Sequence, residues 1–167
     1  MNLKALGGLL ETVPQFQRLQ NAARGPYARA RVQVLPAAVP FTLATLRRES
    51  RVPMLVFTPR PDDARQLYEQ LILWSGPDDT VLHFPETEAL PFERLTPDTT
   101  TVYQRLRALT ALAEVYEGQE PALVVTSASG LTMKSFGPEL LAQEFHVVHK
   151  GESVSMDTLL GRWVSMG

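Results

Sequence analysis

The chain has 167 residues, of which 44% are apolar and 20% are charged, the composition of a soluble globular protein with one main hydrophobic core. Sixteen lysines and arginines against eighteen aspartates and glutamates leave a formal net charge of -2, so counterion release from nucleic acid could not drive strong binding by the chain as a whole. The lack of cysteine excludes disulfides and thiolate chemistry and fits a reducing cytoplasm. Neither an export leader nor an apolar run of the roughly 20 residues that cross a bilayer is visible, so we expect a cytoplasmic protein without membrane contact.

Two short helices are expected at the start of the chain. Apolar residues recur at helical spacing between Leu3 and Val13, and a second set follows Pro14, a residue that suits the first turn of a helix. A Gly-Pro pair then ends the pattern. Residues 1–27 are therefore interpreted as N-terminal helices and a linker, followed by an apolar strand at residues 32–35.

Two groups of arginines lie in this region. The first, on or beside the linker, comprises Arg24, Arg29 and Arg31. The second, at the end of a helix suggested by residues 41–46, comprises Arg47, Arg48 and Arg51. The helix dipole favours cations in a last helical turn, so we expect both groups to be solvated surface residues, with contact to a phosphate or a protein partner as the alternative. Arg29 and Arg31 are candidate interface residues.

From residue 53 onward, strands and helices alternate. Strands are predicted at residues 54–57, 81–84 and 122–126. A helix beginning at Pro61 is predicted to have a core face of Ala64, Leu67, Leu71 and Trp74. A longer helix, entered near residues 98–101, is predicted to present Val102, Leu106, Leu109, Ala113 and Tyr116 on one face. The alternation implies βαβ crossovers and an α/β fold with a mainly parallel sheet flanked by helices.

The end of the chain is predicted to contain a short helix at Leu140 and Leu141, a strand at residues 145–148 and a last helix that Ser155 could cap.

The turn after the predicted strand at residues 32–35 is the natural phosphate site of such a domain, because the next helix points its first N–H groups there. A working P-loop needs glycines, a lysine and a hydroxyl in register. The turn here reads Leu-Pro-Ala-Ala-Val-Pro-Phe-Thr, and its prolines have no N–H to donate. We therefore predict a degenerate nucleotide loop without a cofactor at Pro36, Ala38, Val39 and Pro40.

Other catalytic or metal-binding patterns are weak. The three histidines are His83, His146 and His149. The last two fall on opposite faces of a predicted strand, so ordinary edge or surface histidines are expected and no metal. The acidic residues among the prolines are Glu86, Glu88 and Glu93, and the sequence announces no pocket for acid-base work. Ser127 and Ser129 lack the sequence of a nucleophile elbow and a histidine partner, so we expect them to cap the next helix.

A proline-punctuated segment at residues 84–97 links a predicted strand to the longest helix. It reads Phe-Pro-Glu-Thr-Glu-Ala-Leu-Pro-Phe-Glu-Arg-Leu-Thr-Pro, and it resembles a signature near the start of bacterial transcription-repair coupling factors. The resemblance covers residues 28–167. Further matching positions are Arg105, Leu106, Leu109, residues 122–127, Leu131, residues 149–152, Leu159, Leu160 and residues 163–167.

In that family this region is similar to UvrB, the damage-loading subunit of nucleotide excision repair. The resemblance implies a P-loop NTPase-like fold of the UvrB domain 1 type, with Val39 and Pro40 where the lysine and threonine of the UvrB loop would stand. It implies that residues 28–136 form this first domain, which the chain does not complete, and that residues 137–167 start a second UvrB-like domain, which is truncated. It also implies a full-length protein that uses an ATP- and Mg-dependent DNA translocase to release RNA polymerase stalled at a lesion, and that recruits UvrA. Because its nucleotide loop is degenerate, this chain is expected to be no enzyme, and the motor motifs of the full-length protein are absent here.

The resemblance also suggests partners. The family's main UvrA surface lies in the second domain, and contacts to RNA polymerase and DNA belong to parts outside this chain; packing against other domains of the same protein is expected as well. Phe92, Glu93 and Arg94 are candidate interface residues, although the aromatic and proline residues of this segment could instead fix an irregular connection against the core. Two other readings remain: a functional nucleotide-binding half of a helicase-like enzyme, and an unrelated stand-alone α/β interaction domain.

Overall fold

A three-stranded parallel sheet of order β1-β3-β2 forms the centre of the first of two units, Met1–Lys134 and Ser135–Gly167. The structure is a computed structural model that describes residues 6–25, 28–50, 52–76, 80–87, 98–112, 122–137, 139–141, 150–151 and 153–166. Strands β1 (Met54–Thr58) and β2 (Val81–Phe84) both pair with β3 (Leu123–Ser127). The strands predicted at residues 54–57, 81–84 and 122–126 and their parallel pairing are therefore confirmed.

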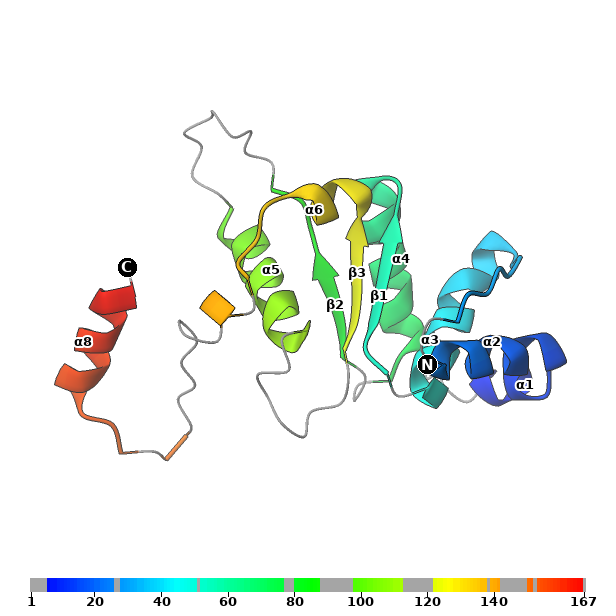
Figure 1. Ribbon diagram of the computed structural model, residues 1–167, viewed down its shortest axis with the longest axis horizontal. Coiled ribbons are helices and arrows are strands. Elements are labelled where there is room, and N and C mark those ends of the chain that lie inside the picture. Colours follow the sequence, from blue (N-terminus) through cyan, green and yellow to red (C-terminus); the bar gives the residue numbers. More distant parts are fainter. Residues whose placement is uncertain are drawn as a thin grey trace. The chain divides into compact units, whose positions relative to one another are not determined.

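Helices cover both faces of this sheet (Figure 1). Helices α3 (Val39–Ser50) and α4 (Pro61–Trp74) pack on one face, where Leu71 and Val125 are fully buried. Helix α5 (Thr99–Leu112) packs on the other face, against Leu82 and Phe84 of β2 and Val124 of β3. Every side chain of the central strand β3 is consequently buried, and the predicted α/β architecture with a helix layer on each face is confirmed.

Prolines and an aspartate set the starts of the helices. Helices α2 (Pro14–Arg24) and α4 each begin at a proline, whose fixed φ suits a first helical turn, where its missing N–H has no partner to lose. Before α5, the Asp98 carboxylate accepts hydrogen bonds from the backbone N–H groups of Thr101 (3.1 Å) and Thr100 (3.3 Å). These bonds hold the pKa of Asp98 below its usual value. All three predicted helix starts are confirmed.

The two predicted N-terminal helices, α1 (Gly8–Glu11) and α2, are confirmed, and α2 packs against α3. Phe16 of α2 is buried at 5% exposure. Arg48 of α3 pairs with Glu11 at 3.1 Å and with Glu49 at 2.9 Å. The backbone of Gly7 lies so close to this guanidinium that an added Cβ would stand 2.6 Å from Arg48 Nη2. An arginine of α3 therefore helps to hold the first helix in place.

The strand predicted at residues 32–35 is wrong. These residues are neither strand nor helix, and Val32 and Leu35 are 44% and 77% exposed. A strand requires a neighbour for its backbone groups, and no strand in the described ranges pairs with this segment. Its apolar residues therefore did not suffice to place it in the sheet.

The inward face predicted for α5 is also wrong in part. Val102 and Leu106 are 38% and 36% exposed, whereas Arg105 and Ala108 are buried. Leu109 does pack against the core, as predicted. Ala113 and Tyr116, the other predicted members of this face, lie outside the described residues.

The second unit contains the predicted last helix, α8 (Met156–Met166). Its Leu160 and Trp163 are 48% and 49% exposed. Residues 139–141 are helical, as predicted, and the strand predicted at residues 145–148 falls outside the described residues. None of the helices in the described ranges has the length and apolar character needed to cross a membrane.

Candidate functional site

The loop that was predicted to be a degenerate nucleotide loop is a short turn that leads directly into α3. A 3-10 turn, η2, spans Pro36–Ala38, and α3 begins at Val39. The Ala38 N–H donates to the Leu35 carbonyl at 2.8 Å, and the Val39 N–H donates to the Pro36 carbonyl. Pro36 and Pro40 have no N–H, so within residues 36–40 only Ala37 keeps a backbone donor outside these bonds.

A polar cluster lies where β2 and β3 end. Ser127 Oγ donates to Glu86 Oε2 at 2.9 Å and accepts the Gly130 N–H at 3.0 Å. Ser129 Oγ lies 2.9 Å from Ser127 Oγ. Ser127 is 1% exposed and caps α6 (Ala128–Thr132), so its predicted capping role is confirmed.

Arg105 of α5 fixes the first residues after β2. Its guanidinium carbon lies 4.0 Å from the centroid of the Phe84 ring, and its Nη1 donates to the Pro85 carbonyl at 2.7 Å. Burial lowers the pKa of Arg105, and the nearby Glu86 carboxylate opposes that shift, so the side chain stays charged near neutral pH. Two residues further on, the N–H and hydroxyl of Thr87 lie 3.1 Å from Met133 Sδ. The beginning of the segment at residues 84–97 is thus held by three separate elements.

The contacts of this cluster hold the residues that follow β2 against β3 and α5. Ser127 has a carboxylate neighbour, but within the described ranges no imidazole bonds to it, and its oxygen already caps a helix. His83 stacks on Tyr68 with ring centroids 5.2 Å apart, and burial lowers the pKa of its imidazole. No group of three or more His, Asp or Glu side chains that could hold a metal occurs among the described residues.

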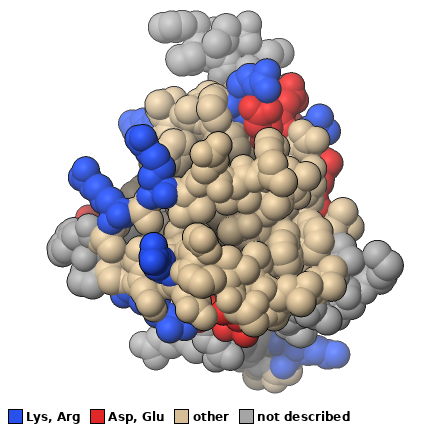
Figure 2. Space-filling view, turned by 90° about the vertical axis from the view of Figure 1, so that its right-hand side faces the viewer, with Lys and Arg blue, Asp and Glu red and all other residues tan. Residues whose placement is uncertain are grey.

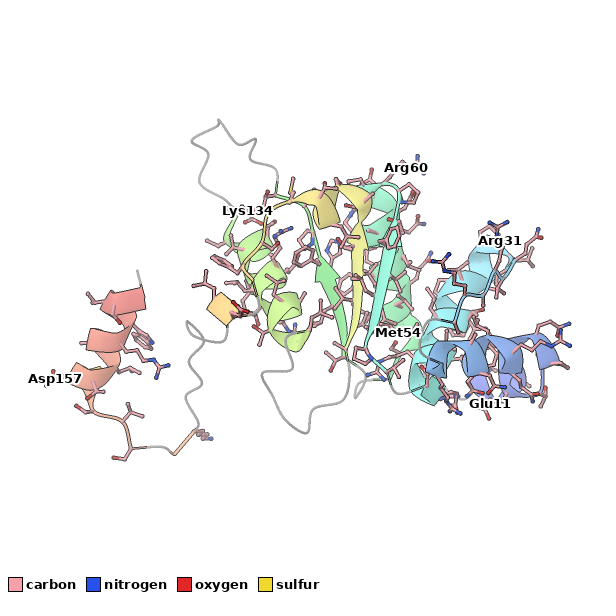
Figure 3. All side chains as sticks on the ribbon, in the orientation of Figure 1. Glu11, Arg31, Met54, Arg60, Lys134 and Asp157 are labelled. Carbon is pink, nitrogen blue, oxygen red and sulfur yellow. The ribbon has the colours of Figure 1, made fainter. Side chains whose placement is uncertain are left out.

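The predicted interface residues fall in two places. Phe92, Glu93 and Arg94 lie outside the described residues. Arg29 and Arg31 are exposed, and Figure 3 shows Arg31 beyond β1, on the side of the sheet that faces α3. Figure 2 views this side of the molecule, and its middle is largely uncharged, with most lysines and arginines toward the margins of the view.

The expectation that both arginine groups are solvated is wrong for Arg47, which is 3% exposed. Arg48 is partly buried between two carboxylates, and Arg24 Nη2 donates to the Glu49 carbonyl at 2.6 Å. The helix dipole favours a cation near the end of α3, but α3 is packed between α2 and α4 and leaves little of its surface to solvent. Arg51 lies outside the described residues.

The fold and the cluster together define a small α/β protein. Polar side chains pack together at the C-terminal ends of its strands β2 and β3. No protein-family profile matches the chain. It is 32% identical to the transcription-repair-coupling factors of Mycobacterium bovis and Mycobacterium tuberculosis, over 96% of this chain and 13% of each relative. It is 26% identical to that of Rickettsia prowazekii, over 59% of this chain and 8% of the relative.

The chain is similar to transcription-repair-coupling factors over nearly its whole length, which confirms the resemblance seen in the sequence. It spans only 13% of the length of the mycobacterial relatives. Residues Phe84, Arg105 and Ser127, which carried part of that resemblance, are the residues that meet around the ends of β2 and β3.

Proposed function

We propose that the chain is the N-terminal, UvrB-like module of a transcription-repair coupling factor, and that it acts through protein contacts without binding a nucleotide. The observation that carries the second part is the state of the turn at residues 36–40. Two of its five residues are prolines, and the N–H groups of Ala38 and Val39 are already bonded to carbonyls. A triphosphate at this turn would have to break those bonds and would find no lysine within the turn.

The family supports the first part of the proposal. In the full-length protein, this module would belong to a cytoplasmic machine that releases stalled RNA polymerase with an ATP- and Mg-driven motor. It would help to recruit UvrA, mainly through the second domain, and it would pack against other domains of the same protein. The packed cluster around Arg105 and Ser127 supports a non-catalytic role, because its polar groups bond to one another and to the backbone.

Titration with fluorescently labelled ATP and magnesium tests the absence of a nucleotide site. We expect no saturable binding in the micromolar range. Saturable micromolar binding would instead favour a nucleotide-binding half of a helicase-like enzyme. Binding that disappears after replacement of Thr42 by alanine, but not of Thr45, would locate the nucleotide at this turn, since only Thr42 lies next to the loop, with its hydroxyl 2.8 Å from the Ala38 carbonyl.

A pull-down with UvrA tests the partner role. The 167-residue chain is compared with a chain extended through the next domain of its gene, and we expect stronger retention by the extended chain. Replacement of Arg29 and Arg31 by glutamine tests whether these exposed arginines contribute, with Arg107→Gln on exposed α5 surface as the control. If the extended chain carries no second UvrB-like domain and retains no UvrA, the chain is an unrelated interaction domain.

A further inference from the structure

The charge of the chain is divided unevenly along its sequence. Residues 1–51 contain eight of the sixteen lysines and arginines but only two of the eighteen aspartates and glutamates, so this part has a formal charge of +6. Residues 52–167 carry a formal charge of -8. Residues 12–48 contain six arginines and no aspartate or glutamate. The near-neutral total therefore conceals a strongly basic N-terminal part, and attraction of an anion depends on this local charge.

The two carboxylates of the N-terminal part are already paired with one arginine. Glu11 Oε1 lies 3.1 Å from Arg48 Nη2, and Glu49 Oε1 lies 2.9 Å from Arg48 Nε. The backbone carbonyl of Glu49 accepts a hydrogen bond from Arg24 Nη2 at 2.6 Å, which anchors the end of α2 to α3. Both carboxylates therefore neutralise the partly buried Arg48 and not the arginines at the surface.

The exposed arginines lie on α2 and on the segment that follows it. Arg18, Asn21 and Arg24 are all exposed and are three residues apart, so they form one row along α2. Arg29 and Arg31 are exposed between α2 and η2, and Figure 3 shows Arg31 beyond β1, where α2 also lies. None of Arg18, Arg29 and Arg31 makes a hydrogen bond or an ion pair with the residues that the structure describes. We call these five residues the N-terminal arginine surface.

We propose that the N-terminal arginine surface binds the phosphate backbone of duplex DNA. Arginine and asparagine side chains are common phosphate ligands in protein–DNA complexes. Duplex DNA carries one negative charge per about 1.7 Å of its axis, together with condensed counterions, so arginines that have no carboxylate beside them gain free energy by releasing those counterions. Contacts of this kind do not read the base sequence. The proposal goes beyond the proposed function and depends neither on the nucleotide loop nor on UvrA.

An acidic protein surface fits the N-terminal arginine surface less well. The buried centre of a protein–protein interface is usually rich in aromatic and other apolar residues. No large apolar side chain is exposed on α2, from Pro14 to Arg24, whose outer row consists of arginine and amide side chains. Val32 and Leu35 are exposed further along the chain, so an acidic polypeptide is the competitor to test.

Fluorescence anisotropy with a short labelled DNA duplex tests the proposal on the 167-residue chain. Non-specific contacts of this kind should give saturable micromolar binding at about 50 mM salt. The three arginines without a partner among the described residues predict a slope of about -2.7 for the logarithm of affinity against the logarithm of salt concentration, which is a loss of about twentyfold between about 50 and 150 mM salt. No saturable binding at the lower salt concentration, or binding that does not respond to salt, would overturn the proposal.

Substitutions locate the contact. Each of Arg18→Gln, Arg29→Gln and Arg31→Gln should reduce the steepness of the salt dependence by about 0.9, and the triple variant should bind the duplex hardly at all. These side chains have no partner in the described part of the chain, so the melting temperature should not change. Arg107→Gln is the matched control, because Arg107 is exposed on α5, outside the basic part. If Arg107→Gln weakens binding as much as the other single variants, the proposal fails.

Competition with polyglutamate separates a phosphate backbone from an acidic protein partner. We expect polyglutamate to displace the duplex only at a concentration of carboxylates at least about tenfold above that of phosphates, because it has the lower linear charge density. Displacement at equal concentrations would assign the N-terminal arginine surface to an acidic protein and overturn the proposal. A single-stranded DNA should bind more weakly than the duplex, with a slope of about -2.1, and tighter binding of the single strand would also contradict it.

Discussion

The hydroxyl of Ser127 donates a 2.9 Å hydrogen bond to the carboxylate of Glu86 and accepts the N–H of Gly130 on its other side. It thereby joins the end of the central strand to the residues that leave β2 and to the first turn of α6. Phe84 and Arg105 lie at the same edge, through the contact of the guanidinium with the ring. The stability of this edge depends on a few side chains that can be changed one at a time.

Replacement of Ser127 by alanine should lower the free energy of unfolding by about 1–2 kcal/mol, because α6 loses its N-terminal cap and Glu86 loses a donor. Urea denaturation followed by circular dichroism measures this. Ser129→Ala is the matched control and removes a single side-chain contact, so its cost should stay below about 1 kcal/mol. Equal costs for the two variants would contradict the capping role.

Replacement of Arg105 by methionine should lower the free energy of unfolding by about 2–3 kcal/mol, since a charged hydrogen bond to the Pro85 carbonyl and a cation-π contact are both lost. Methionine keeps much of the apolar stem, which separates the guanidinium from simple loss of volume. Arg107 is exposed on the same helix, and Arg107→Met should change stability by no more than about 0.5 kcal/mol. Chemical denaturation of both variants measures these changes. An Arg105→Met variant as stable as the wild-type chain would contradict a stabilising role of the guanidinium.

Gly130 leaves no room for a side chain. An added Cβ would lie 2.5 Å from Thr126 Oγ1 and 3.2 Å from the Phe84 carbonyl oxygen, so Gly130→Ala must push α6 away from the strands. We expect a loss of about 1–3 kcal/mol, measured by thermal unfolding. Gly8 is the control, because a Cβ added there would have no neighbouring atom within 4 Å. Gly8→Ala should leave stability unchanged or raise it by up to about 1 kcal/mol.

His83 should make stability depend on pH. Burial lowers the pKa of its imidazole below 6.5 in the folded protein, so the unfolded chain binds the proton more readily. Its contribution is therefore fully present above pH 6.5, and it is lost as the pH falls through the folded-state pKa. Thermal melts between pH 8 and pH 5 should show a steeper loss for the wild-type chain than for His83→Gln. If the melting temperatures of the two proteins fall in parallel with pH, His83 does not cause the pH dependence.

Much of the fold could be predicted from the sequence because local signals set it. Pro14 and Pro61 mark helix starts through the geometry of a single residue, and the unbroken apolar run that became β3 indicated a strand covered on both faces. The order β1-β3-β2 could not be obtained in this way. The residues of β1 do not indicate that its neighbour in the sheet is β3 and not β2, the next strand along the chain.

The errors have physical causes of the same kind. Val102 and Leu106 have the spacing of an inward helical face, yet α5 directs Arg105 inward. Its guanidinium packs on the ring of Phe84, and this contact has no signal in the sequence of the helix. Arg47 is buried because helices pack on both sides of α3, which its own sequence cannot reveal. At the candidate site, the capping role of Ser127 followed from its position after a strand, whereas its bond to Glu86 joins residues 41 positions apart and had no local signal.

The place of β3 between β1 and β2 also has a consequence for how the protein is made. Among the described strands, β1 and β2 each pair with β3 alone, so neither has its described partner until Leu123–Ser127 has left the ribosome. While the residues before β3 are synthesised, the apolar segments β1 and β2 therefore have backbone N–H and C=O groups without strand partners. Nascent chains are prone to aggregate at such a stage. Slowing synthesis just before residue 123 should therefore lower the yield of soluble protein more than slowing it just after residue 127.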